Sequence, residues 1–188
     1  MLHLLGGVQE PNLLDPSEDL TNVGQYSLTS LNISNNNAVS PDGLISAELF
    51  EPIAVNSFLQ ANNTSVDINT DYTFSVFLKS TGANRAISIS IRTTGLVLIG
   101  DNELITVTGN WKRFLLTRNV ASNTLIRMLI GGGSTWSTGE DLHAWGCQLN
   151  KGPLSSYQRV GAQIGGLNIT DFDSLDNWAD SEGHTLTP

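Results

Sequence analysis

The sequence predicts an all-β protein, built as a sandwich or barrel of about ten short strands. The clearest evidence is a run in which Ile87, Ile89 and Ile91 alternate with serines. A strand places these isoleucines on one face, whereas a helix would scatter them around its surface. No long stretch shows helical periodicity. Charged residues make up only 14% of the chain, which is typical of β-rich extracellular or virion proteins rather than helical cytosolic enzymes.

The strand predictions depend on alternation and on the turn residues between alternating runs. Residues 72–79 alternate apolar and polar side chains, with Phe77 as the exception. Residues 100–102 (Gly-Asp-Asn) predict a hairpin between the runs beside them, and the three asparagines at 35–37 predict a turn. Residues 131–140 form a long expected loop. The expected strands are 27–33, 44–50, 53–59, 72–79, 86–91, 95–99, 103–107, 111–118, 125–130 and 142–149.

The last expected strand, residues 142–149, has a clear alternating pattern. Strict alternation there predicts that His143, Trp145, Cys147 and Leu149 share one face. We expect Trp145 to be a core residue, and Trp111 likewise. Cys147 is the single cysteine, so no internal disulfide is possible, and on this strand we expect it to be a small buried hydrophobe.

Several fragments together resemble the carbohydrate-binding-module-like jelly rolls of bacteriophage structural proteins. They are the W-G-x-Q-L run from Trp145, the Gly-Pro turn and S-x-Y after it, and residues 12–14 with 17–19, 41–43, 72–76 and 111–114. The resemblance spans about residues 12–157. It departs at Asn150, where members often carry Glu, so a metal held by that carboxylate in relatives would be lost here. It implies a jelly-roll sandwich over 12–160, between an N-terminal arm (1–11) and an acidic C-terminal arm (161–188).

The resemblance also implies a non-enzymatic structural protein of the phage virion. It would be a capsid-decorating (cement) protein or a tail appendage, made in the host cytoplasm, since residues 1–8 lack a signal-peptide pattern. The alternative is a host-glycan-binding adhesin or carbohydrate-binding module. Expected partners are further copies of the chain as a homo-oligomer, other virion proteins and a surface polysaccharide. A net charge of -9 argues against nucleic acid, and no run approaches the roughly 18 apolar residues that span a membrane.

Sugar binding needs an aromatic ring for the sugar face and planar polar side chains around it. Trp136 is the best candidate ring, because it lies in a Gly/Ser/Thr-rich loop with no obvious cover. The alternative is that Trp136 anchors the loop or fills a subunit contact. Candidate rim groups are Tyr26, Asn84, Arg85 and Arg92.

No catalytic constellation appears: the three histidines have no metal-ligand spacing, and no nucleophile motif is present. We therefore expect no enzyme activity and no cofactor beyond a structural calcium ion. Asp15, Glu18 and Asp141 could offer it hard oxygen ligands, although they match no defined calcium motif.

The C-terminal arm carries more apolar side chains than a purely solvated tail would. We expect it to pack on a neighbouring subunit, and the alternative is that it wraps its own domain. The candidate interface residues are Ile169, Phe172, Leu175 and Trp178.

Overall fold

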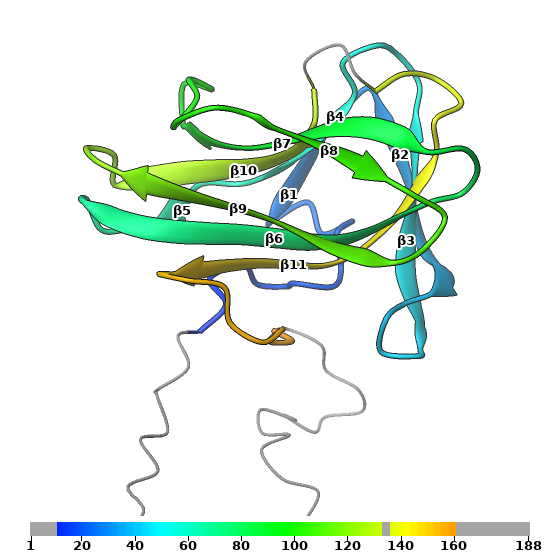
Figure 1. The fold of residues 1–188 in the computed structure, drawn as a ribbon, viewed down its shortest axis with the longest axis horizontal. Helices are drawn as coiled ribbons and strands as arrows, with labels where there is room; N and C mark the ends of the chain where they lie inside the picture. Colours follow the sequence, from blue (N-terminus) through cyan, green and yellow to red (C-terminus); the bar gives the residue numbers. More distant parts are fainter. Residues whose placement is uncertain (1–10, 133–135, 161–188) are drawn as a thin grey trace, which may run out of the picture.

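Two antiparallel sheets pack face to face in the computed structural model, which describes residues 11–132 and 136–160 (Figure 1). Sheet A has the order β1-β4-β10-β7-β8, with β5 also pairing with β10, and sheet B has the order β2-β3-β11-β6-β9. The described residues contain no helix, so the predicted all-β jelly-roll sandwich is confirmed. Residues 161–188, with the four candidate interface residues, lie outside the described residues. The strands are β1 Tyr26–Thr29, β2 Leu31–Val39, β3 Ile45–Pro52, β4 Phe58–Ala61, β5 Thr64–Ser65, β6 Thr70–Ser80, β7 Arg85–Thr93, β8 Glu103–Val107, β9 Lys112–Val120, β10 Leu125–Gly131 and β11 Leu142–Lys151.

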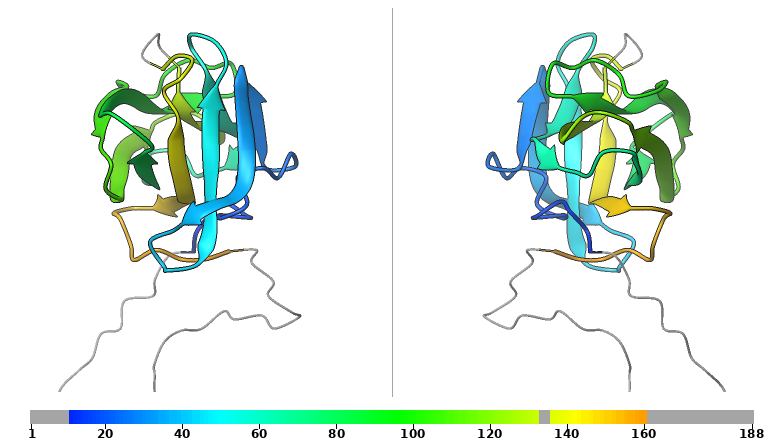
Figure 2. Two further views of the ribbon diagram at one scale, coloured as in Figure 1. Left: turned by 90° about the vertical axis from the view of Figure 1, so that its right-hand side faces the viewer. Right: turned by 90° about the vertical axis from the view of Figure 1, so that its left-hand side faces the viewer.

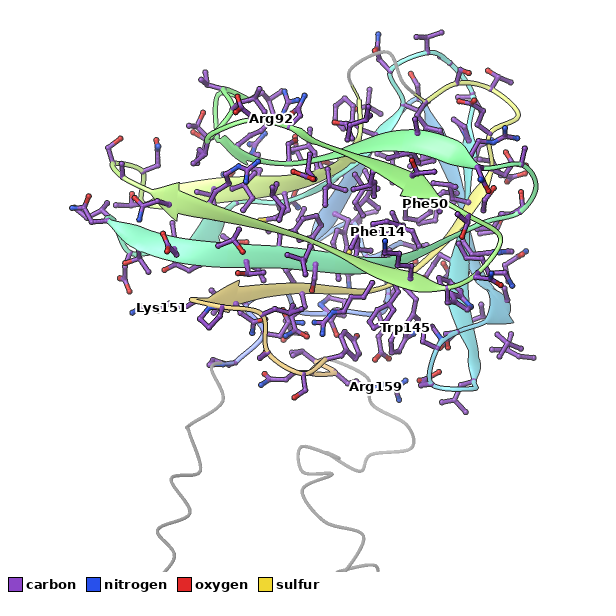
Figure 3. All side chains as sticks on the ribbon, viewed as in Figure 1. Phe50, Arg92, Phe114, Trp145, Lys151 and Arg159 are labelled. Carbon is purple, nitrogen blue, oxygen red and sulfur yellow. The ribbon has the colours of Figure 1, made fainter. Side chains whose placement is uncertain are left out.

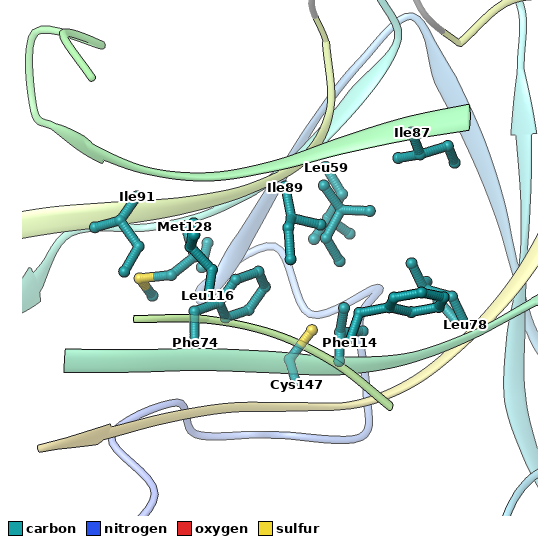
Figure 4. Close-up of a cluster of buried hydrophobic side chains, with 14 of the residues drawn as sticks. Leu59, Phe74, Leu78, Ile87, Ile89, Ile91, Phe114, Leu116, Met128 and Cys147 are labelled. Carbon is teal, nitrogen blue, oxygen red and sulfur yellow. The ribbon is translucent and has the colours of Figure 1, made fainter. Parts of the chain in front are cut away.

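The core lies between the sheets, where each strand turns its apolar residues inward. Ile87, Ile89 and Ile91 of β7 are completely buried and face Phe74 of β6 and Phe114 of β9 across the sandwich (Figure 4). Burying each of these isoleucines contributes on the order of 1.5–3 kcal/mol. The serines between them point to the other side of sheet A, as the alternation predicts.

Several strand and turn predictions are wrong in detail. Residues 95–99 form no strand, only a bridge from Leu98 to Arg92. Residues 53–59 are mostly loop, and the strand there is β4, which begins at Phe58. The predicted hairpin around 100–102 does not form, because β8 pairs with β7 instead and brings Ile105 opposite Ile87 in the core layer. Residues 27–33 divide into β1 and β2 at Ser30, whose φ of 51° breaks the extended backbone. The asparagines at 35–37 belong to β2, where the register with β3 shifts.

A bulge in β11 overturns the expected shared face. Leu142 and Ala144 point into the core, but the register slips between Trp145 and Gln148, so that Cys147 and Leu149 point into the core as well. Gly146 has a φ of 64°, which favours glycine. Trp145 is therefore buried, at 3% exposure, but it lies outside the central core cluster. Cys147 is buried as predicted.

The two ends of the described chain meet on sheet B (Figures 1 and 2). Residues 12–17 run beside β11 beyond the bulge, where the amide of Leu13 donates to the carbonyl of Leu149 and that of Cys147 to the carbonyl of Ser17, both at 2.9 Å. Residues 152–160 then cross the outer side of this sheet, where Arg113 Nη1 donates to the carbonyl of Ser155 at 2.9 Å.

The ring of Tyr157, from this crossing segment, covers Trp145. Their ring centroids are 4.5 Å apart, and Phe77 lies 5.4 Å from Trp145 and 5.9 Å from Tyr157. Part of the outer side of sheet B is thus occupied by the chain itself. Neither of these two terminal segments crosses sheet A, so the outer side of sheet A is the candidate surface for a ligand (Figure 1).

Candidate functional site

Strand register places a set of side chains in rows on the outer side of sheet A. Gln60 of β4, Leu129 of β10 and Ser90 of β7 are Cα partners in one row. Arg127 and Arg92 are partners in the row beside it. Their neighbours Ile126, Met128 and Ile130 belong to the core cluster, so alternation turns this set outward. We call the set the sheet A face: Phe58, Gln60, Ser88, Ser90, Arg92, Leu104, Arg127 and Leu129.

Hydrogen bonds hold the polar side chains of the sheet A face. Gln60 Nε2 donates to Ser27 Oγ at 3.3 Å. Arg92 Nε donates to Ser90 Oγ at 3.1 Å, and its Nη1 donates to the carbonyl of Leu96 at 3.2 Å. Arg127 Nε donates to Asn63 Oδ1 at 2.6 Å. Both guanidinium groups are thus positioned by neutral partners.

Apolar groups and small residues complete the sheet A face. The ring of Phe58 is partly exposed and lies in register with Gly131, which has no side chain. Leu104 is 62% exposed, whereas Leu129, in the middle of the sheet, is only 2% exposed. Ser88 lies beside Leu104 in register, and its hydroxyl is buried without a hydrogen-bond partner in the described part of the chain. Gln60, Ser88 and Ser90 are also buried, at 7%, 3% and 0% exposure. The accessible part of the sheet A face therefore consists of Phe58, Leu104 and the two partly exposed arginines.

Only one predicted sugar-contact residue, Arg92, lies on the sheet A face, on the side of the sandwich opposite Trp145 (Figure 3). Tyr26 is buried, and its hydroxyl donates to the carbonyl of Pro16. Asn84 and Arg85 lie at the other end of β7, seven or more residues away, or roughly 23 Å along the strand. These residues do not form one site.

Trp136 is 0% exposed, which contradicts the expectation that no cover exists for its ring. The ring packs 6.1 Å from Phe50, and Nε1 donates to the carbonyl of Glu140 at 2.7 Å. Gly131 makes room for it, because a Cβ there would lie 2.5 Å from the indole. Trp136 is thus a loop anchor, which was the alternative, and its buried ring cannot stack on a sugar in this conformation.

The expected calcium ligands are not brought together. No three His, Cys, Asp or Glu side chains cluster within residues 11–132 and 136–160. Glu18 pairs with Arg159 at 2.6 Å and accepts a hydrogen bond from the Tyr157 hydroxyl at 3.1 Å, while burial raises the pKa of Glu18 above its usual range. Asp15 is exposed and Asp141 is half-buried. A calcium site therefore stays a prediction without a ligand set.

Trp111 is a partly exposed tryptophan rather than the expected core residue. It precedes β9, and its Nε1 donates to the carbonyl of Val39 at 2.9 Å. Its ring lies 6.4 Å from that of His143. The indole is held against the protein, and it is not part of the sheet A face.

The sequence analysis missed Phe58, Gln60 and Arg127. Arg127 carried a usable signal, because it alternates with Ile126 and Met128 and must point outward. Its position beside Arg92 depends on the pairing of β10 with β7, more than 30 residues apart in the chain, which no local pattern reveals. Nor does any local pattern show that β4 adds Phe58 and Gln60 to the same surface.

No protein-family model and no curated protein matches the sequence. The structure is similar to the CBM22-1 xylan-binding domain from Paenibacillus barcinonensis Xyn10C, at 10% identity and a TM-score of 0.53, over 78% of this chain and 98% of that one. It is also similar to TmCBM61 in complex with β-1,4-galactotriose, at 13% identity and a TM-score of 0.52, over 76% and 99% of the two chains.

The chain also matches parts of larger proteins. It covers 27% of an arabinose-bound GH51 α-L-arabinofuranosidase and 21% of the enzymatically active domain of bacteriophage CBA120 tailspike protein 4, with TM-scores of 0.58 and 0.53 and identities of 12% and 10%. At these identities the similarities show a shared fold, the jelly roll of carbohydrate-binding modules. Within the described residues there is no helix long and apolar enough to cross a membrane.

Proposed function

We propose that this chain is a carbohydrate-binding module that holds a polysaccharide on the sheet A face. The fold supports this proposal, because jelly rolls of this kind include a xylan-binding domain and a module that binds galactotriose. Fold alone does not determine function. The observation that carries the proposal is that two arginines, held by hydrogen bonds, lie on the same face as the partly exposed Phe58 and the exposed Leu104, on the side of the sandwich opposite Tyr157 and its segment.

The chemistry of the sheet A face suits a sugar. A pyranose ring presents C–H groups that pack on aromatic and aliphatic side chains, here Phe58 and Leu104. Its hydroxyls need hydrogen-bonding groups at fixed positions, which Arg92 and Arg127 offer, whereas Gln60 is only 7% exposed. An open row of such groups across several strands fits an extended chain better than a small enclosed ligand.

Binding is a better account of this face than hydrolysis. Glycosidases use a pair of carboxylates placed on either side of the scissile bond. The strands of sheet A contain one acidic residue, Glu103, and its partner is Ile89, a core residue. It therefore lies in a row that faces the core rather than the outer side. The strand positions of the sheet A face offer no acid–base pair.

Affinity electrophoresis in gels containing xylan, galactan or other polysaccharides tests the proposal. Phe58→Ala should weaken binding by about five- to tenfold, because a ring contact contributes on the order of 1 kcal/mol. Trp111→Ala is the matched control on the other sheet, and it should retain wild-type binding. Binding lost with Trp111→Ala and kept with Phe58→Ala would place the ligand elsewhere and refute the site.

A virion setting is the second candidate for the biological context of this module. Its support is the similarity to part of a bacteriophage tailspike, although the same fold occurs in an arabinofuranosidase. Assembly through the C-terminal arm would give an oligomer by light scattering that becomes a monomer when the chain ends at Val160. A monomer in both forms would contradict this assembly.

A further inference from the structure

The sheet A face is positively charged in a strongly acidic protein. The chain has 18 acidic and 9 basic residues and a net charge of -9. Arg92 and Arg127 are nevertheless both on this face, and the strands of sheet A place no carboxylate beside them. Such a local reversal of charge favours a negatively charged ligand.

The two arginines are unusually placed for a pair of like charges. Arg127 and Arg92 are direct Cα partners on neighbouring antiparallel strands, a position in which Cα atoms are roughly 4.5–5.5 Å apart. Like charges in this arrangement destabilise a sheet. The ion pairs of the described residues involve other cations, Lys151 and Arg159, so no carboxylate relieves the repulsion.

Several guanidinium donors remain free for a ligand. Arg127 uses Nε, on Asn63, and Arg92 uses Nε and Nη1, on Ser90 and Leu96. Both Nη atoms of Arg127 and Nη2 of Arg92 make no hydrogen bond within the described part of the chain. Their neutral partners orient the forks but leave the positive charge uncompensated.

Protection of a sheet edge does not explain the pair. Charged side chains often block edge strands against aggregation, but β10 and β7 lie inside sheet A, with β4 and β8 on either side of them. Two adjacent arginines on inner strands of the sheet are better explained by an anion that binds them both.

We propose that the sheet A face selects an acidic polysaccharide, whose carboxylate or sulfate groups bind Arg92 and Arg127. This inference rests on the proposed sugar-binding function and adds the ligand class. Charge-assisted hydrogen bonds are roughly twice as strong as neutral ones, and the planar arginine fork matches carboxylate and sulfate oxygens. Phe58 and Leu104 lie on β4 and β8, with two strands between them, and pack against different sugar rings of the bound chain.

Isothermal titration calorimetry with three ligands of equal length tests this selection. The ligands are an oligogalacturonate (carboxylate), a sulfated galacto-oligosaccharide (sulfate) and a neutral galacto-oligosaccharide. The wild-type protein should bind at least one acidic ligand about tenfold or more tighter than the neutral one, and the preference should fall with added salt. The carboxylate and sulfate arms identify which anion is preferred.

The key variant is Arg92→Gln with Arg127→Gln, which should lose the acidic preference by about tenfold or more. The matched control is Lys79→Gln with Lys112→Gln, which removes the same charge from sheet B and should keep the preference. If thermal melting shows that the double arginine variant is unfolded, the single Arg127→Gln variant takes its place.

Equal or tighter binding of the neutral ligand would overturn the acidic selection but leave sugar binding standing. No binding of any glycan, in these titrations or in the polysaccharide gels, would overturn both proposals. Equally tight binding of a single-stranded DNA of the same charge would show a general anion site and would also overturn the selection of sugar.

Discussion

Truncation of Trp145 should destabilise the protein by about 3 kcal/mol. Replacing a buried tryptophan with alanine typically costs about 3–5 kcal/mol, and this indole also donates from Nε1 to Ser46 Oγ at 3.1 Å, worth about 1 kcal/mol. Two ring contacts, with Tyr157 and Phe77, add to its packing. The value lies at the low end because Tyr157, on a surface segment, can settle into part of the cavity.

Urea denaturation of the wild-type protein and Trp145→Ala measures this loss. The urea midpoint should fall while the m value stays unchanged. In thermal unfolding of the same two proteins, we expect the melting temperature to fall by about 6–12 °C for a domain of this size. Trp111→Ala is the matched control, because it removes the same side chain from a partly exposed position, and it should cost about 1 kcal/mol.

A double-mutant cycle with Tyr157→Ala tests whether the segment 152–160 provides the cover. Residues in direct contact show coupling of about 0.5–3 kcal/mol. A Trp145→Ala midpoint close to that of the wild type would refute the placement of Trp145. A full loss without coupling to Tyr157 would instead show that the tryptophan is buried by other residues.

Two further substitutions test buried features of the sandwich. Burial raises the pKa of the Glu48 carboxyl from its usual value of 4.5 to about 8. Between pH 4.5 and pH 8, therefore, only the unfolded state loses this proton. The free energy of unfolding then falls as the pH rises, by at most about 1.4 kcal/mol per pH unit. Glu48→Gln should flatten that slope in urea melts at pH 5 and 8, and parallel slopes would contradict the burial. Gly146→Ala should destabilise the protein by about 2 kcal/mol or more. The new Cβ would lie 2.9 Å from the Tyr157 ring, and the backbone there has a positive φ. A melting temperature equal to that of the wild type would refute the bulge.

The core of the fold could be predicted from the sequence because its pattern is local. The alternating isoleucines of β7 and the run in β6 define their own inward faces. The bulge in β11 had a sequence signal as well, since a glycine inside a strand pattern often marks one, and Gly146 interrupts that pattern. Its effect was missed because strict alternation was continued through it, which put Trp145 on the side of Cys147.

The candidate site depends on contacts between distant segments, and the sequence reveals these poorly. The burial of Trp136 comes from Phe50, more than 80 residues earlier in the chain, so its loop composition wrongly suggested exposure. Arg92 was identified as a polar residue of the rim, but its partner Arg127 was not. Only strand register places two arginines side by side with Phe58 and Gln60.

Mapping a bound sugar onto the chain tests the central claim most directly. We would titrate isotope-labelled protein with the tightest-binding oligosaccharide and follow the backbone amide signals by NMR. Binding at the sheet A face predicts the largest shifts in β4, in residues 88–92 of β7 and in residues 127–131 of β10. Shifts confined to sheet B, or no shift with any glycan, would contradict the account.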